Sequence, residues 1–369
     1  MLRYSTYITF ICLFFSFSLQ AEQEIRIAIG KPSTQLTLKG SGLSALSTDG
    51  KNLAKQDTIT LSADASGIVV NGKKSGSSTV NITSPGFIFV DGNQYRNALE
   101  IKWQLVSGTS QLVLIHAIPL ETYVVGIVSS EVPHSWPLEA LKAQAIAART
   151  YAIWQKFRRL DKSYHMESSV LDQVYGGAQK EHSLAEQAAQ QTKGQVLTYD
   201  NKPIQAYFHA TCGGQTESAQ EAWGSNLPYL PGSKCGYCKT ARQYHWTYSI
   251  SKKNLRRALK SVFSDDISHI KIIQHTKSDR AKLMEISHRK QKKQISATSF
   301  RELLGYNNIR STLIDKISFG WLDVTFTGRG HGHGVGMCQW GAMGLAKAGF
   351  TADKILERYY PGAEIRQLY

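Results

Sequence analysis

The sequence has little acidic charge, few cysteines and no long apolar run after its first twenty residues. A membrane-spanning helix needs roughly 20 consecutive apolar residues, so we expect no span in the body of the chain. The 369 residues include 43 Lys and Arg against 28 Asp and Glu, which gives a net charge of +15. That charge favours association with acidic polymers and carries no information about a reaction. With 42% hydrophobic residues, the composition is that of a globular protein.

The N-terminus contains the one sustained apolar run, Ile8 to Leu19. Arg3 precedes this run, and the small residue Ala21 follows it, just before Glu22. The pattern predicts a signal peptide over residues 1–21, with an uncleaved membrane anchor as the alternative. We therefore expect an exported protein in the periplasm, the cell envelope or the extracellular space. Nucleic acid is scarce there, so acidic envelope polymers explain the positive charge better.

Five cysteines are present, and removal of the signal peptide would take Cys12 with it. Two paired motifs, His209-x-x-Cys212 and Cys235-x-x-Cys238, can each present two ligands to a tetrahedral zinc ion. Disulfides are the default in an oxidising compartment, yet the three cysteines of this cluster cannot all pair with one another. The sequence predicts a structural zinc site at these four residues, with a disulfide or plain buried thiols as alternatives. His245 competes as the fourth ligand, and the distant Cys338 receives no catalytic role.

The chain divides into stretches of different character, and together they predict an α+β fold. Residues 22–100 form a β-rich N-terminal region, because short β-branched runs such as Ile25 to Ile29 alternate with Gly, Ser and Asn clusters. Residues 251–320 form a basic insertion with its own small α/β structure. It consists of a helix at 252–263, strands at 270–273 and 282–286, and a charged hairpin tip at 288–293.

Glu131 lies between an apolar run, Tyr123 to Val128, and an alanine-rich helix that begins near Leu138. Ser135 is the predicted N-cap of that helix. The Glu131 carboxylate, in the bend between the apolar run and this helix, is either a partner of nearby backbone donors or a working acid.

A later helix over 184–193 is predicted to begin with a capping box made by Ser183 and Glu186.

Three stretches of the sequence resemble the SpoIID/LytB family of stage II sporulation protein D and the amidase enhancer LytB. The first runs from Glu121 through Ser130-Glu131-Val-Pro133 to Tyr151. The second is Gly328-Arg-Gly-His-Gly-His-Gly, which continues to Gln339-Trp340-Gly, and the third is Tyr359-Tyr-Pro-Gly362. The resemblance covers roughly residues 100 to 369. It implies a mixed SpoIID-like core over 101–250 and 321–369, into which the basic insertion is placed.

The SpoIID resemblance implies a lytic transglycosylase that cleaves peptidoglycan glycan strands, preferably strands without stem peptides. Glu131 would be the general acid and base, while the C6 hydroxyl of the substrate closes a 1,6-anhydro ring. Val128, Val132 and Trp136 are candidate walls of an apolar pocket around it. The predicted substrate-binding residues are Arg149, Tyr175, His333, Gln339 and Trp340.

The LytB resemblance implies a different function, that of a non-enzymatic enhancer or partner of an N-acetylmuramoyl-L-alanine amidase. A zinc hydrolase is the least favoured interpretation. Four protein ligands would saturate the zinc, whereas a catalytic zinc needs an open position.

Overall fold

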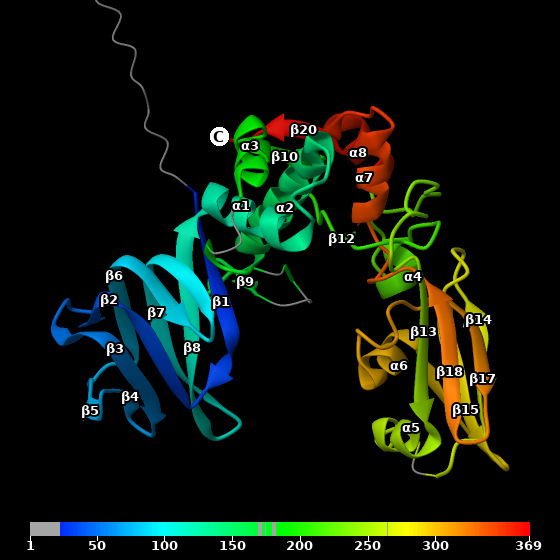
Figure 1. Cartoon of the computed structure of the whole chain (residues 1–369), viewed down its shortest axis with the longest axis horizontal. Helices are drawn as coiled ribbons and strands as arrows, with labels where there is room; N and C mark the ends of the chain where they lie inside the picture. Colours follow the sequence, from blue (N-terminus) through cyan, green and yellow to red (C-terminus); the bar gives the residue numbers. More distant parts are fainter. Residues whose placement is uncertain (1–22, 169–171, 174, 179–181, 264) are drawn as a thin grey trace, which may run out of the picture.

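The computed structural model describes residues 23–168, 172–173, 175–178, 182–263 and 265–369, and it shows a mixed α+β protein (Figure 1). The predicted signal peptide lies outside these residues. Three large hydrophobic clusters organise the chain. The first joins a β-sheet to a helical layer, and the second lies under the C-terminal helices. The third fills a separate unit over residues 245–329, which we call the C-terminal unit although two helices follow it in the chain.

The N-terminal region is a nine-stranded sheet with the order β5-β4-β3-β2-β6-β7-β8-β1-β9. Its strands are β1 (Glu24–Ser33), β2 (Gln35–Ser47), β3 (Asn52–Asp64), β4 (Gly67–Val70), β5 (Lys73–Lys74), β6 (Thr79–Val90), β7 (Asn93–Val106), β8 (Thr109–Pro119) and β9 (Met166–Glu167). All neighbouring strands are antiparallel except β9, which pairs in parallel with β1. The turns at Asn71-Gly72 and Asp91-Gly92 have positive φ at both residues, the geometry that two-residue hairpin turns require. The sequence predicted this β-rich character, and the sheet continues to Pro119.

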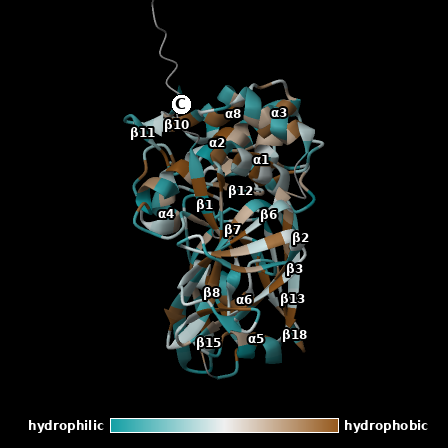
Figure 2. Ribbon diagram, turned by 90° about the vertical axis from the view of Figure 1, so that its left-hand side faces the viewer, coloured by the Kyte–Doolittle hydropathy of each residue, from teal (hydrophilic) through white to brown (hydrophobic). Residues whose placement is uncertain are grey.

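The helical layer lies against this sheet. It contains α1 (Leu120–Glu131), α2 (Leu138–Arg158) and α3 (Ser183–Gln191), and the C-terminal helices α7 (Gln339–Lys347) and α8 (Ala352–Tyr359) pack against α2. Small buried residues such as Ala143 and Ala147 let α2 approach its neighbours closely. A small sheet of β10 (Gln195–Tyr199), β11 (Lys202–Pro203) and β20 (Glu364–Gln367) completes the layer. Figure 2 shows hydrophobic and hydrophilic residues interleaved along these elements, as expected where one face is buried.

Two predicted helix caps are wrong in detail. The N-cap of α2 is Pro137, not Ser135, and no side chain caps this helix. The N-cap of α3 is His182, whose side chain accepts a hydrogen bond from the Ala185 backbone N–H, so Ser183 is already inside the helix. Both helices therefore begin within two residues of the predicted positions.

The C-terminal unit has its own core, in which Leu255, Phe300 and Phe326 are fully buried. One sheet contains β13 (His245–Ser251), β18 (Asp323–Arg329) and β17 (Ile314–Phe319), and another contains β14 (His269–His275), β15 (Ala281–His288) and β16 (Gln291–Ser296). The helices α5 (Lys252–Ala258) and α6 (Ala297–Leu304) accompany them. The predicted insertion, 251–320, thus shares its core with β13, which ends at Ser251, and with β18, which begins only at Asp323.

Short elements connect this unit to the helical layer. They are β12 (Phe208–His209), α4 (Ala219–Trp223) and β19 (Met337–Cys338), and β12 pairs in parallel with β19.

Among the residues that the structure describes, no helix is both long and apolar enough to cross a bilayer.

His116 on β8 predicts a specific dependence of stability on pH. Its side chain is only 1% exposed, and burial lowers its pKa from 6.5 to about 4. Between pH 6.5 and 4 the unfolded chain therefore binds a proton that the folded chain excludes. The free energy of unfolding should fall by about 1.4 kcal/mol per pH unit from this residue as the pH drops through that window. In urea titrations at pH 7 and pH 5, His116→Gln should show a shallower loss than wild type; equal losses would contradict the assignment.

Candidate functional site

Glu131 is the last residue of α1, at a point where three helices meet. The side-chain amide nitrogen of Gln339, the first residue of α7, lies 3.4 Å from Glu131 Oε2 and 3.4 Å from Gln144 Oε1 on α2. Gln339 and Gln144 are 5% and 1% exposed, whereas Glu131 is partly exposed. The buried amide of Gln339 thus connects the partly exposed Glu131 to the buried amide of Gln144. Gln144 was not among the predicted site residues, because it resembles any polar residue of a helix.

The surroundings of Glu131 are largely apolar. Val128 and Val132 are buried at 0% and 4% exposure, and Trp136 at 8%. The ring of Trp136 meets the half-buried ring of Trp340 edge-on, with centroids 5.3 Å apart. The structure therefore brings Gln339 and Trp340 together with the segment that carries Glu131, although about 200 residues separate them in the sequence.

The glycine-rich loop between β18 and β19 holds the two histidines of the motif. A Cβ atom on Gly332 would lie 2.7 Å from the Cβ of His209, and one on Gly336 would lie 2.0 Å from the Tyr207 carbonyl oxygen. Both glycines also have positive φ, so the loop depends on them. His333 Nδ1 accepts from the Val335 N–H at 3.1 Å, and Nε2 donates to the Phe208 carbonyl at 2.9 Å. Burial lowers the pKa of His333 to about 4, so the ring is neutral at pH 7. Both of its nitrogens are used in hydrogen bonds to backbone groups.

Four cysteines form a buried cluster of sulfur atoms. The Sγ atoms of Cys212, Cys235, Cys238 and Cys338 all lie within 4.8 Å of one another, and each cysteine carries a free thiol. A tetrahedral zinc with Zn–S bonds of about 2.3 Å places its sulfurs about 3.8 Å apart. The 3.5 Å between the Sγ atoms of Cys212 and Cys238 is close to that spacing. The cluster therefore suits a metal ion that prefers thiolate ligands in tetrahedral coordination.

His209 lies outside this cluster, so the structure replaces it with Cys338 in the candidate ligand set. The parallel pairing of β12 with β19 sets Cys338 opposite His209, and the Cys212 N–H lies 3.3 Å from Cys338 Sγ. His209 instead directs Nδ1 to the Val335 carbonyl at 3.1 Å. The competing ligand His245 is exposed at the start of β13. Sequence spacing could not reveal Cys338, because 126 residues separate it from Cys212.

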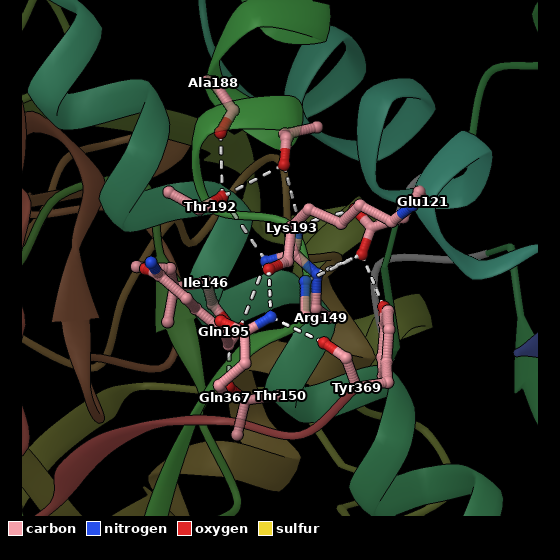
Figure 3. Close-up of polar contacts among 12 residues, drawn as sticks. Glu121, Ile146, Arg149, Thr150, Ala188, Thr192, Lys193, Gln195, Gln367 and Tyr369 are labelled. Atoms are coloured by element: carbon pink, nitrogen blue, oxygen red, sulfur yellow. Dashed lines mark hydrogen bonds and ion pairs between the residues drawn. The ribbon is translucent and has the colours of Figure 1, made fainter. Parts of the chain in front are cut away.

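Arg149, which was predicted to bind substrate, is buried among groups of the protein itself. Its side chain is 0% exposed, and two of its nitrogens bind the Glu121 carboxylate at 2.7 and 2.9 Å. It also donates to the carbonyls of Ala189 and Gln195 (Figure 3). Burial opposes ionisation of Glu121, yet the hydrogen bonds and charge of Arg149 hold the pKa of that carboxyl below its usual value. Arg149 thus ties α2 to α1, α3 and β10.

We expect Arg149→Met to lower the free energy of unfolding by about 3 kcal/mol, because removal of one partner leaves a half-buried carboxylate uncompensated. Urea denaturation measures this loss. The control is Arg256→Met, since Arg256 and Asp266 form an ion pair that is more than half exposed, and such pairs contribute little. An Arg149→Met chain that keeps its stability but loses glycan binding would restore the substrate-contact role.

Tyr175 is also a core residue, which corrects its predicted contact with substrate. It is 4% exposed, and its ring lies 5.7 Å from that of Tyr123 and 5.8 Å from that of His116. A Cβ atom on Gly126 would come within 2.6 Å of this ring. Gly126 in the Glu131 segment is therefore required for packing between α1 and Tyr175.

Comparison with known proteins gives consistent matches over most of the chain. A family model described as stage II sporulation protein matches residues 108–199, and one described as a domain of unknown function matches residues 226–336. The chain is 35% identical over 288 residues to an uncharacterized protein of Brachyspira hyodysenteriae, covering 77% of this chain and 75% of that protein. It is 33% identical over 272 residues to stage II sporulation protein D of Bacillus subtilis, covering 69% of this chain and 76% of the relative.

A further relative is the amidase enhancer of Bacillus subtilis, 29% identical over 290 residues. The match covers 65% of this chain but 40% of that longer protein. The family model that matches residues 108–199 includes Glu131. The chain therefore belongs to the SpoIID/LytB family.

Proposed function

We propose that this protein is an exported lytic transglycosylase that cleaves peptidoglycan glycan strands, with Glu131 as its general acid and base. The observation that carries the proposal is the carboxylate of Glu131 at the meeting point of α1, α2 and α7, with the Gln339 amide 3.4 Å away. Glu131 is partly exposed, whereas Gln339, which contacts it, and Gln144, which contacts Gln339, are buried. The names of the relatives agree with a role at the cell wall.

A single carboxyl group suffices for the proposed reaction. Glu131 gives its proton to the glycosidic oxygen as the bond to C1 of the muramic acid breaks. The C6 hydroxyl of the same sugar then attacks C1, and its proton passes to the Glu131 carboxylate. The products are a 1,6-anhydro end and a free 4-hydroxyl, with the enzyme returned to its starting state. Glycosidases that use water as the nucleophile generally need a second carboxyl group.

Gln339 acts in this proposal as a positioning residue. Its amide group can donate to Glu131 Oε2 while Gln144 Oε1 fixes the amide from behind. A donor at that place orients the carboxylate without taking up its proton. The first turn of α7, capped by the Cys338 sulfur that accepts from the Gly341 N–H, holds Gln339 in place.

The test is to incubate the purified protein with denuded and with peptide-bearing glycan and to detect anhydro ends by mass spectrometry. Anhydro products from the denuded strands would support the proposal. Their absence, together with stimulation of a purified N-acetylmuramoyl-L-alanine amidase, would favour the second candidate. That candidate is a non-enzymatic amidase enhancer, and the match to the amidase enhancer supports it.

We further propose that Cys212, Cys235, Cys238 and Cys338 hold one structural zinc ion. Four thiolates complete its tetrahedral coordination, so the metal binds no substrate. It would tie the segment after β12 and the loop after α4 to the start of α7, the helix that carries Gln339. The metal would thus stabilise the back of the Glu131 site.

A further inference from the structure

A row of aromatic rings extends over the surface beside the Glu131 site. The ring centroids of Trp154 and Tyr207 lie 6.3 Å apart, those of Tyr207 and Trp223 lie 4.8 Å apart, and those of Trp223 and His333 lie 5.3 Å apart. The rings come from α2, from the residue before β12, from the end of α4 and from the glycine-rich loop. We call these four residues the aromatic row. Four segments that are distant in sequence thus bring their rings into contact, one pair in a T-shaped and the other two in a tilted arrangement.

The aromatic row is not part of a closed core. Trp223 is 42% exposed, and the other three rings are half-buried. By contrast, Trp136 and Trp246 are 8% and 5% exposed. Contiguous apolar rings on a surface mark a binding site more often than scattered ones do. Ring faces with polar edges suit a ligand that is itself apolar on its faces and polar around its rim.

A fixed cation lies at one end of the row. The guanidinium of the exposed residue Arg158 is 4.6 Å from the centroid of the Trp154 ring, one helical turn further along α2. Such a contact holds the long side chain over the ring while its outer N–H groups remain available. A guanidinium in this position matches a carboxylate on the ligand.

The row and the Glu131 site are built on the same two segments of the chain. Gln144, which contacts Gln339, precedes Trp154 by ten residues on α2, a distance of about 15 Å along the helix axis. On the other side, the Met337 N–H donates to the Tyr207 carbonyl at 3.0 Å, and Gln339 follows two residues later. The same two segments, α2 and β19 with the start of α7, therefore support both the carboxylate and the rings. An extended ligand can reach from one to the other.

We propose that the aromatic row binds the glycan strand next to the cleaved bond, and that Arg158 pairs with the lactyl carboxylate of a muramic acid residue. This inference rests on the proposed function. Pyranose rings present apolar C–H faces and a rim of hydroxyl groups, which is the chemistry that the row fits. The lactyl carboxylate is free only where the stem peptide has been removed, since in peptide-bearing strands it forms an amide. Arg158 would therefore favour denuded strands.

The test measures binding of the full mature chain to denuded glycan and to neutral chitin oligosaccharides, in a Glu131→Gln background that prevents turnover. Trp223→Ala and Trp154→Ala should weaken binding to both ligands about tenfold, in the range for loss of one stacked ring. Trp223→Phe should keep most of the binding, because it keeps a ring. Arg158→Gln should weaken binding to denuded glycan and leave chitin binding unchanged.

The matched control is Trp321→Ala, because Trp321 is 91% exposed and precedes β18 in the C-terminal unit, away from the row. Its loss should change neither affinity. Equal affinities of wild type and Trp223→Ala, or an equal loss in Trp321→Ala, would overturn the proposal. Normal glycan binding with lost stimulation of an amidase in the Trp223→Ala chain would also overturn it and assign the row to a protein partner.

The outcome can be separated from that of the proposed function. If the row variants bind normally while Glu131→Gln abolishes anhydro products, the transglycosylase function is supported and glycan binding by the aromatic row is rejected. If the row variants lose binding while Glu131→Gln cleaves as well as wild type, the row stands as a glycan surface and the catalytic role of Glu131 falls.

Discussion

Glu131→Gln should lower the rate of anhydro-end formation by about 10²–10⁴-fold, the range expected for loss of a positioned acid and base. Glutamine keeps the shape of the side chain and its capacity to pair with the Gln339 amide, but it cannot give up and recover a proton. Far-UV circular dichroism and glycan co-sedimentation should show that folding and binding are kept. The rate is measured by mass spectrometry of products from denuded strands.

Glu139 supplies the matched control. It is the second residue of α2, accepts from the Ala352 N–H at 2.7 Å and pairs with Lys142 at 2.8 Å. A glutamine there keeps an acceptor for Ala352, so Glu139→Gln should retain most of the activity. Cleavage by Glu131→Gln at the wild-type rate would end the enzymatic interpretation of this residue and leave the enhancer as the remaining candidate.

Local sequence signals predicted much of the fold. β-branched runs separated by Gly, Ser and Asn clusters predicted the N-terminal sheet, and alanine-rich stretches predicted α2 and α3. Each of these signals acts within about ten residues, where backbone conformation and hydrophobic periodicity decide the outcome. The helix caps were missed by one or two residues because proline and histidine took the places of the expected serines.

The roles of individual residues depended on contacts that local patterns do not contain. Arg149 and Tyr175 were both predicted to bind substrate, and the structure shows both in the core, Arg149 against Glu121 and Tyr175 against the glycine of α1. A buried arginine cannot be told from a ligand-binding one until its partner is known, and Glu121 precedes it by 28 residues. Cys338 is a similar case, since only the pairing of β12 with β19 brings it to the other three thiols.

Cys338→Ser should lose the metal and a large part of the unfolding free energy together, because binding of a structural zinc is coupled to folding. Wild-type protein purified without added metal should carry about one zinc per chain, the count for a single four-ligand site. Elemental analysis by mass spectrometry gives this ratio, and thermal unfolding with and without a chelator gives the loss of stability. Cys235→Ser should behave in the same way.

His209→Gln distinguishes the two possible ligand sets. In the structure His209 bonds to the Val335 carbonyl rather than to the sulfur cluster, so its replacement should leave the zinc content at about one per chain. Loss of zinc in His209→Gln with retention in Cys338→Ser would restore the set expected from sequence spacing. A disulfide between any two of the four cysteines in non-reduced peptide maps would exclude both sets, since a metal-binding thiolate cannot also be oxidised. The zinc content of Cys338→Ser thus tests whether a metal fixes the start of α7, and with it Gln339.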